Sequence, residues 1–283
     1  MDTFLTLNNL QLLFKQHRIQ PKKTLGQNFL IDRNIRNKIL SFIEITTDDI
    51  IIEIGAGTGA LTGLLSEKAA LVYAFEKDEK LVEILQEQTS GLSTINIIKG
   101  DFLEIDEGFF RTIGKKIKII GNLPYYVASP ILFKLLDMRY YWNTALVMIP
   151  EDVALKIVAK TGDKNFGFMG FVFSLLTQST ICYKIKGSAF YPEPEITSVL
   201  MKISIPDKPL MEIKNQQLFW SIAPKLFVQR RKTILNVMKN SFHINRETAI
   251  EILQKAGIQP QLRSHQIEIP YLIELIKQIS KQI

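Results

Sequence analysis

The apolar segment Ile50–Ile54 and the glycine-rich loop after it constrain the fold of this chain more than any other feature. The segment is too apolar for a strand with one face in water, so we predict a central strand of a parallel sheet. The loop, Gly55-Ala56-Gly57-Thr58-Gly59, leads into a helical pattern from Ala60 to Lys68. A buried strand that enters a helix through glycines indicates an α/β fold with a ligand site at the strand's end.

The alternation of strands and helices continues to about residue 159. Further strands are predicted at 71–76, 95–98, 117–120 and 145–149, and helices at 4–19, after Asp32, and at 78–88, 129–136 and 151–159. This order predicts a parallel sheet with helices on both faces. After an apolar helix near 171–176, residues 180–186 and 198–205 alternate in polarity, which predicts an antiparallel hairpin at one edge of the sheet.

The last part of the chain has helical spacing and carries most of the charge excess. Residues 207–283 hold 12 Lys and Arg against 6 Asp and Glu, and so contribute +6 to the net charge of +7. A concentrated basic excess is typical of a protein that binds a polyanion such as nucleic acid, although an unspecific solvated surface has the same composition. We predict two domains, 1–206 with the sheet and 207–283 as a small helical domain.

The composition argues against several classes of protein. No apolar run approaches the roughly 18 residues of a membrane span, and residues 1–4 lack the order of a signal peptide, so we expect a cytoplasmic protein that does not bind membranes. Cys182 is the single cysteine, which rules out an internal disulfide framework. The three histidines show no ligand spacing, so no metal site is expected.

Two acidic residues at strand ends complete a candidate nucleoside site with the glycine loop. Glu76 follows the loop by about 20 residues, where an acid that binds ribose hydroxyls belongs. Asp101 follows the third strand, where a carboxylate could accept a hydrogen bond from an adenine amine. Either acid alone is more often a helix cap. The loop lacks the Gly-Lys-Ser/Thr of a phosphate loop, and it differs from the Gly-x-Gly-x-x-Gly of dinucleotide binders, although NAD remains an alternative.

The fourth strand ends in Gly121-Asn122-Leu123-Pro124-Tyr125-Tyr126. Pro124 keeps Leu123 out of helical geometry, so an extended backbone with accessible carbonyls is expected. The Asn122 amide both donates and accepts, and the tyrosines offer flat faces. Together these groups could hold a planar ring that bears an amine. The alternative is an ordinary strand-to-helix turn with buried tyrosines.

Six motifs in this order resemble the small-subunit ribosomal RNA adenine dimethyltransferases, the KsgA family, over nearly the whole chain. They are Gln27-Asn28-Phe29-Leu30-Ile31-Asp32, residues 53–62, Gly100-Asp101, Gly121-Asn122-Leu123-Pro124-Tyr125, Phe190-x-Pro192-x-Pro194 and Phe227-x-Gln229-Arg230-Arg231-Lys232-Thr233. The resemblance implies a Rossmann-like methyltransferase sheet with an antiparallel edge hairpin and a small all-helical C-terminal domain. Tyr126 departs from the pattern, because family members commonly have Asn there.

The resemblance also implies S-adenosylmethionine as the methyl donor. Asn28 and Leu30 match the segment that closes over it, and Gly55 matches the backbone contact to its methionine part. Glu76 matches the ribose-binding acid. Asp101 matches the residue at the cofactor's adenine amine, and Asn122 the residue between the cofactor and the target.

Catalysis is expected to depend on Asn122, Leu123, Pro124, Tyr125 and Phe190. The Asn122 side-chain oxygen and the Leu123 carbonyl would accept hydrogen bonds from adenine N6–H. Tyr125 and Phe190 would stack on the target base.

The expected reaction is dimethylation of N6 on two adjacent adenines near the 3′ end of small-subunit (16S) ribosomal RNA. The expected substrate is an assembling 30S particle in ribosome biogenesis, and the expected protein is a monomer. Arg230, Arg231 and Lys232 are expected to start a helix and contact RNA phosphates, with Lys22 and Lys23 extending that surface. The alternatives are an Erm-like methyltransferase of large-subunit RNA, a non-catalytic RNA-binding assembly factor and, more distantly, a nicotinamide dehydrogenase.

Overall fold

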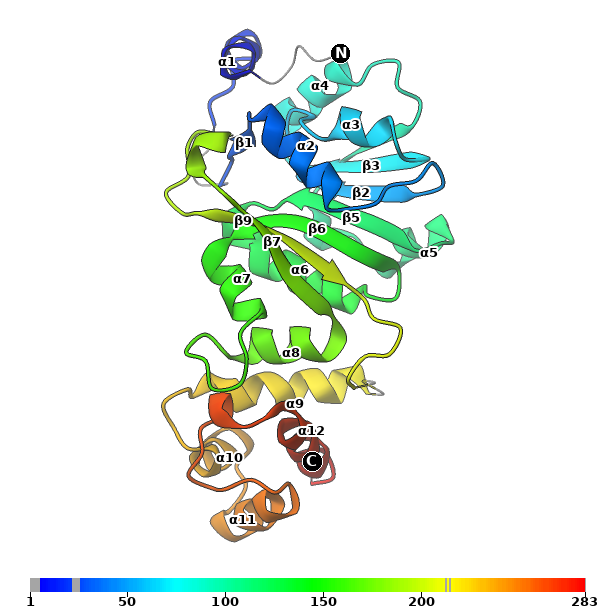
Figure 1. Cartoon of the computed structure of the whole chain (residues 1–283). Coiled ribbons are helices and arrows are strands. Elements are labelled where there is room, and N and C mark those ends of the chain that lie inside the picture. The colour runs from blue at the N-terminus through cyan, green and yellow to red at the C-terminus, as the bar shows by residue number, and fades with distance from the viewer. Residues whose placement is uncertain (1–5, 22–25, 212, 214, 283) are drawn as a thin grey trace. The chain divides into compact units, whose positions relative to one another are not determined.

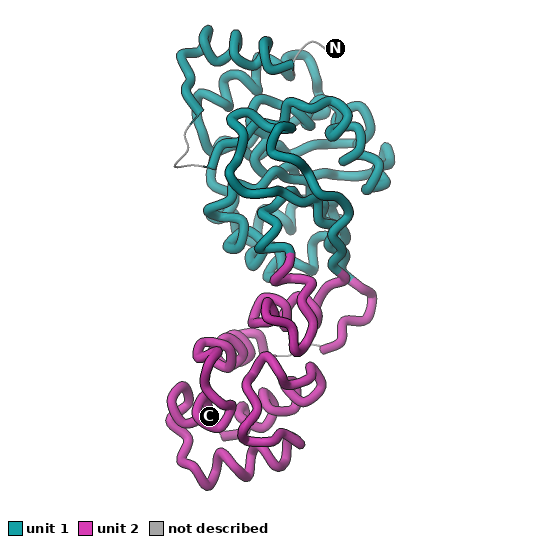
Figure 2. Tube along the Cα trace, turned by 60° about the vertical axis from the view of Figure 1, so that its left-hand side comes forward, with its two compact units in different colours: residues 1–154, 179–205 teal, residues 155–178, 206–283 magenta. Residues whose placement is uncertain are grey.

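The computed structural model describes residues 6–21, 26–211, 213 and 215–282. Two compact units divide the chain (Figure 2): unit 1 comprises 1–154 and 179–205, and unit 2 comprises 155–178 and 206–283. The predicted domain division after residue 206 lies beside one border between the units. Residues 155–178, which we placed in the sheet domain, group with the C-terminal residues instead.

A seven-stranded mixed sheet forms unit 1, in the order β4-β3-β2-β5-β6-β9-β7 (Figure 1). Its strands are β2 (Ile50–Ile54), β3 (Leu71–Glu76), β4 (Ile95–Lys99), β5 (Ile117–Asn122), β6 (Trp142–Pro150), β7 (Gln178–Ile185) and β9 (Ser198–Ser204). β2 to β6 pair in parallel, and β9 pairs antiparallel with β6. The expected α/β fold and its antiparallel edge are therefore confirmed.

The central strand β2 fixes where a ligand can bind. Ile51, Ile52 and Ile54 are buried, so side chains on both faces of β2 are covered. The chain leaves β2 toward β3 on one side, and β5 lies on the other. The connections that leave β2 and β5 therefore run in opposite directions along the sheet. A crevice remains between them at the carboxyl ends of these strands, the switch point of the sheet.

Unit 1 also contains short helices. They are α1 (Leu7–Gln16), α2 (Arg33–Ser41), α3 (Thr62–Ser66), α4 (Glu79–Gln88), α5 (Glu107–Ile113), α6 (Ala128–Asp137) and α7 (Glu151–Ile157), which crosses into unit 2. Asp32 caps α2 as predicted, accepting hydrogen bonds from the N–H groups of Asn34 and Ile35. α3 begins later than predicted, because Gly59, at φ +88°, keeps the loop out of helical geometry.

A small second sheet holds the N-terminal segment in place. β1 (Phe29–Leu30) pairs antiparallel with β8 (Phe190–Tyr191), with Phe29 opposite Tyr191 and Leu30 opposite Phe190. Leu30 and Phe190 are both buried in one hydrophobic cluster with Ile120 and Met148. This pairing, which the sequence did not predict, fixes residues near the ends of the central strands.

Unit 2 is helical. It contains α8 (Phe168–Leu176), α9 (Gln216–Val228), α10 (Ile234–Phe242), α11 (Arg246–Lys255) and α12 (Ile269–Ser280), and α9 contacts α8, α10 and α12. The prediction that Arg230, Arg231 and Lys232 start a helix is wrong. They lie in the turn before α10, which begins at Ile234 because the Thr233 hydroxyl accepts a hydrogen bond from Asn236 N–H.

Candidate active site

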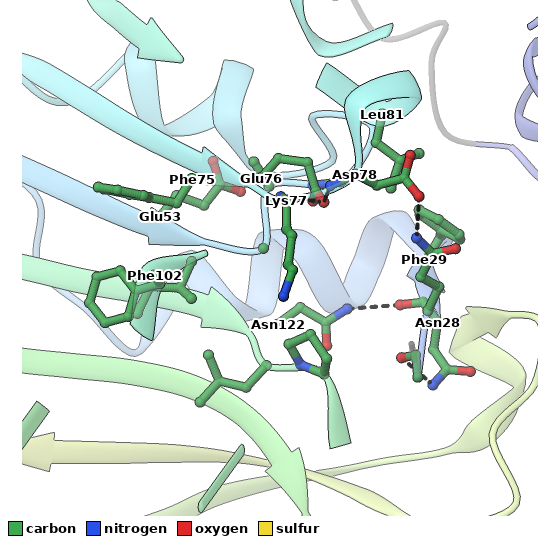
Figure 3. A pocket seen from close by; sticks show the side chains of 18 of the residues that line it. Asn28, Phe29, Glu53, Phe75, Glu76, Lys77, Asp78, Leu81, Phe102 and Asn122 are labelled. Carbon is green, nitrogen blue, oxygen red and sulfur yellow. Dashed lines mark hydrogen bonds between the residues drawn. The ribbon is translucent and has the colours of Figure 1, made fainter. Parts of the chain in front are cut away.

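A pocket of about 470 Å³ opens at the carboxyl edge of the parallel strands (Figure 3). Residues 26–30 and the segments that follow β2, β3, β4 and β5 supply its walls. All six residues predicted to bind a cofactor line it: Asn28, Leu30, Gly55, Glu76, Asp101 and Asn122. Residues far apart in the sequence thus meet at the switch point of the sheet.

Gly55 lets β2 and β5 approach each other closely. Its φ is +74°, a left-handed conformation that favours glycine, and a Cβ there would lie 3.0 Å from the backbone oxygen of Asn122. Glycine at this position therefore allows the left-handed conformation of the loop and the close approach of the Asn122 backbone.

Backbone amides orient the Glu76 carboxylate. Oε2 accepts a hydrogen bond from Gly57 N–H at 2.9 Å, and Oε1 accepts from the N–H groups of Lys77 and Asp78 at 2.8 Å each. Burial raises the pKa of Glu76, and these three hydrogen bonds oppose that rise. The carboxylate is thus fixed between the glycine loop and α4, where its remaining lone pairs can accept hydrogen bonds from a ligand.

Asp101 forms an ion pair inside the pocket. Lys77 Nζ donates to Asp101 Oδ2 at 2.7 Å, and Leu103 N–H donates to Oδ1 at 2.9 Å. Partial burial acts to raise the pKa of Asp101, but the hydrogen bond and charge of Lys77, together with the Leu103 N–H, hold it below its usual value. Asp101 is therefore an ionised acceptor held in one orientation.

Glu53 lies beneath the pocket and is only 2% exposed. Its Oε2 accepts a hydrogen bond from the Thr62 hydroxyl at 2.6 Å. Burial raises the pKa of Glu53 to about 8, with Thr62 opposing the rise and the charge of Glu76 adding to it. Glu53 is consequently protonated at neutral pH.

The N-terminal segment sets the orientation of Asn122. Asn122 Nδ2 donates to the backbone carbonyl of Asn28 at 2.8 Å, as Figure 3 shows. The segment is also attached at Gln27, whose Nε2 donates to Asp78 Oδ2 at 3.3 Å. Because the Asn28 carbonyl accepts from the Asn122 nitrogen, Asn122 Oδ1 is the atom that can accept a hydrogen bond from a ligand.

The residues after Asn122 form one wall of the pocket. Pro124 is extended, with φ −58° and ψ 131°. Tyr125 then starts a 3₁₀ turn through Val127, in which the Pro124 carbonyl accepts from Val127 N–H. The Tyr125 hydroxyl makes a short hydrogen bond with Ser198 Oγ, and burial raises the pKa of Tyr125 although this bond opposes the rise. Tyr125 is therefore an anchored, neutral ring.

The other predicted site residues within the described part of the chain are not among those that line the pocket. Phe190 is 3% exposed, packs in the core, and is not among the residues that line the pocket. Lys22 and Lys23 lie outside the described residues. Arg230, Arg231 and Lys232 are exposed in unit 2.

The structure also bears on the other sequence expectations. Within the described parts of the chain, no helix is long and apolar enough to cross a membrane. The same residues contain no group of three or more His, Cys, Asp or Glu side chains that could hold a metal ion.

Glu53, Lys77 and Tyr126 also line the pocket. The sequence analysis predicted no site role for Glu53 or Lys77, whereas Tyr126 is one of the two tyrosines expected to offer a flat face to a planar ring. Glu53 was read only as part of a buried strand and of a family motif. Lys77 directly follows Glu76. This position beside a predicted strand end could have indicated that Lys77 lines the pocket. Tyr126 is 52% exposed, and its ring lies beside Gly26.

Comparison with known proteins identifies the family of this chain. A family model described as "Ribosomal RNA adenine dimethylase" matches residues 18–278. A "Ribosomal RNA small subunit methyltransferase A" from Syntrophus aciditrophicus (strain SB) is 38% identical over 274 residues, covering 95% of this chain and 97% of that protein. A protein of the same name from Shouchella clausii (strain KSM-K16) is 38% identical over 259 residues, covering 89% of this chain and 87% of that protein.

Solved structures show the same fold. A dimethyladenosine transferase from Plasmodium falciparum has a TM-score of 0.77 at 22% identity, covering 90% of this chain and 98% of that one. The 23S rRNA methyltransferase ErmE has a TM-score of 0.67 at 23% identity, covering 89% and 99%. Since the family model spans most of the sequence and the relatives match along nearly their full length, this chain belongs to the ribosomal RNA adenine dimethylase family.

Proposed function

We propose that this protein transfers methyl groups from S-adenosylmethionine to N6 of two adjacent adenines near the 3′ end of small-subunit (16S) ribosomal RNA, giving N6-dimethyladenine. The observation that carries the proposal is the Asn122 carboxamide, held by the Asn28 carbonyl in a pocket that also contains Glu76 and Asp101. The relatives named small subunit methyltransferase A favour the small-subunit RNA over the large-subunit RNA of an Erm-like enzyme.

The pocket fits S-adenosylmethionine. Its volume of about 470 Å³ is within the usual range for ligands of this size. Glu76 would accept hydrogen bonds from the ribose hydroxyls, and Asp101 would accept one from the adenine amine. The Gly55 backbone would contact the methionine part. When bound, the cofactor would supply an electrophilic methyl group on a sulfonium centre.

Asn122 and Leu123 would prepare the nucleophile. Adenine N6 attacks poorly because its lone pair is delocalised into the ring. Asn122 Oδ1 and the Leu123 carbonyl would each accept one N6–H, which draws the nitrogen toward tetrahedral geometry and frees the lone pair. Methyl transfer then depends mainly on positioning, so neither residue has to act as a strong base.

Aromatic rings would hold the target adenine after it leaves its stack. Tyr125 is anchored by Ser198, and stacking a base on an aromatic ring contributes about 1–3 kcal/mol. Phe190 remains our predicted second ring, but in this structure it is buried. Tyr126, which lines the pocket and is half exposed, is therefore a further candidate for the opposite wall.

Ribosomal RNA is the substrate class to which the family points. We further propose that the protein acts as a monomer in the cytoplasm on RNA within an assembling 30S particle, as a step of ribosome biogenesis. The exposed cations Arg230, Arg231 and Lys232 would contact phosphates of that RNA. We propose the same role for Lys22 and Lys23.

A methylation assay with purified protein and labelled S-adenosylmethionine tests the proposed function. Small-subunit particles lacking the modification, large-subunit particles and protein-free 16S RNA would be offered separately, and the products mapped by mass spectrometry. Two adjacent dimethyladenines in the small-subunit RNA are expected. Label in large-subunit RNA would instead support the Erm-like alternative. RNA binding without binding of S-adenosylmethionine would support a non-catalytic assembly factor.

A further inference from the structure

The ion pair between Lys77 and Asp101 lies within the candidate cofactor pocket. Figure 3 shows the Lys77 side chain reaching between Glu76 and Asn122, and its Nζ lies 2.7 Å from Asp101 Oδ2. The Lys77 side chain is 61% exposed and that of Asp101 is 23% exposed. Because Lys77 lines the pocket and contacts the partly buried Asp101, its ammonium can also contact a ligand that binds to Asp101.

The order of the strands identifies which end of the pocket this is. The glycine loop follows β2, Glu76 ends β3, and Asp101 follows β4, which is the edge strand on that side of the sheet. A nucleoside whose ribose is held by Glu76 therefore extends its base toward Asp101 and Lys77. This assignment rests on the proposed function, because it assumes that the ligand is S-adenosylmethionine.

The two side chains differ in how firmly they are held. Leu103 N–H donates to Asp101 Oδ1 at 2.9 Å, so the carboxylate keeps its position without Lys77. Lys77 has a long, exposed side chain, and its ammonium can pivot between Asp101 and a nearby ligand atom. An isolated carboxylate accepts from the 6-amino group of adenine but opposes the oxygen of a 6-oxo purine. With Lys77 beside it, the oxo oxygen gains a donor, while the carboxylate accepts from the adjacent ring N–H.

We propose that Lys77 is a specificity-determining residue, which with Asp101 offers the base of the cofactor both a donor and an acceptor. The pocket therefore accepts a cofactor with a 6-oxo purine nearly as well as one with adenine. A pocket that recognised the base through Asp101 alone would reject the oxo analogue strongly, since a recognition site rejects analogues that leave its buried polar groups unpaired.

Calorimetric titration with S-adenosylhomocysteine and S-inosylhomocysteine tests this inference in the absence of RNA. The unchanged protein is expected to bind the two compounds with affinities within about 10-fold of each other, and Lys77→Met to widen the preference for the adenine compound to about 100-fold. Lys77→Arg keeps a charged donor and should retain the narrow preference.

Lys134→Met is the matched control. The Lys134 charge also acts on Asp101, but its Nζ donates to the Leu103 carbonyl at 2.8 Å and the residue does not line the pocket. Its removal should leave the ratio of the two affinities unchanged. Denaturant titration of each variant checks that it is folded.

Two outcomes separate this inference from the proposed function. If both compounds bind and the ratio is the same in Lys77→Met as in the unchanged protein, Lys77 does not set base specificity and only the inference fails. If neither compound binds to the folded, unchanged protein, the proposed function fails with it.

Discussion

At the scale of single residues, backbone groups determine what the polar side chains of the pocket can do. The Asn28 carbonyl accepts a hydrogen bond from the Asn122 nitrogen and so fixes the orientation of the Asn122 carboxamide. Three backbone N–H groups fix the Glu76 carboxylate. The sequence indicated both residues, because Glu76 ends a predicted strand and Asn122 closely follows one. It could not indicate the orientation of Asn122, which depends on a carbonyl 94 positions earlier in the chain.

Replacing Asn122 by Ala should lower the rate of methylation by about 100-fold or more, the usual cost of losing one preorganised hydrogen-bonding group. RNA binding should remain nearly intact, because this side chain acts on N6 after the RNA is bound. Single-turnover methylation and filter binding measure the two effects. Asn96→Ala, at an exposed position on β4, is the control and should retain activity. Loss of RNA binding in Asn122→Ala would count against a catalytic role.

The buried Glu53 should make stability depend on pH. The unfolded chain releases this proton near pH 4.5, whereas the folded protein holds it up to about pH 8. Between these values the folded state binds more protons, so the free energy of unfolding falls as pH rises, by up to about 1.4 kcal/mol per pH unit.

Glu53→Gln remains uncharged and should lack this component. Denaturant titration from about pH 5 to pH 8 should therefore show the variant gaining stability relative to the unchanged protein as pH rises. Glu83→Gln, at an exposed position on α4, controls for the loss of a carboxyl group. A constant difference between Glu53→Gln and the unchanged protein would contradict the raised pKa of Glu53.

At the scale of elements, the central strands were predictable and the small elements were not. The predicted bounds of β2 and β3 agree with the structure, because strands covered on both faces have continuous apolar sequences. β1 and β8 contain two residues each and pair across about 160 positions, so no local pattern marks them. The sequence analysis did not predict the helix α5 either, which has 7 residues.

Gly55→Ala should disturb the junction of β2 and β5. The left-handed conformation costs alanine about 1–2 kcal/mol, and the added Cβ would lie 3.0 Å from the Asn122 oxygen. Stability should fall by more than the conformational cost, and S-adenosylhomocysteine should bind at least about 10-fold more weakly, which calorimetry would measure.

Gly91→Ala isolates the conformational cost from the steric one. Gly91 also has a positive φ, +84°, but no atom lies within 4 Å of where its Cβ would be. This variant should lose stability through conformation alone and bind the ligand normally. Equal effects of the two substitutions on binding would argue against the steric role of Gly55.

At the scale of the whole molecule, motifs along the chain indicate its family, whereas contacts between distant segments decide how it divides into compact units. The motifs span nearly the entire chain, as does the family match at residues 18–278. Residues 155–178 belong to unit 2 because α8 packs against α9, about 40 positions later, and such a contact leaves no mark in the local pattern. The charge excess of 207–283 remains the basis for assigning an RNA-binding role to the helical part of the chain.

Replacing Arg230, Arg231 and Lys232 together by Gln should weaken binding of small-subunit RNA and reduce its dependence on salt. Each lost phosphate contact removes about 0.7–0.9 from the slope of log K against log salt concentration, so three contacts remove about 2–3. Filter binding over a range of KCl concentrations measures the slope.

A control that neutralises Arg246, Lys255 and Lys281 removes the same charge from exposed positions on and beside α11 and α12. If the effect depends on these specific contacts, the slope should fall more in the first variant than in the control. An unchanged slope would exclude Arg230, Arg231 and Lys232 from the RNA interface.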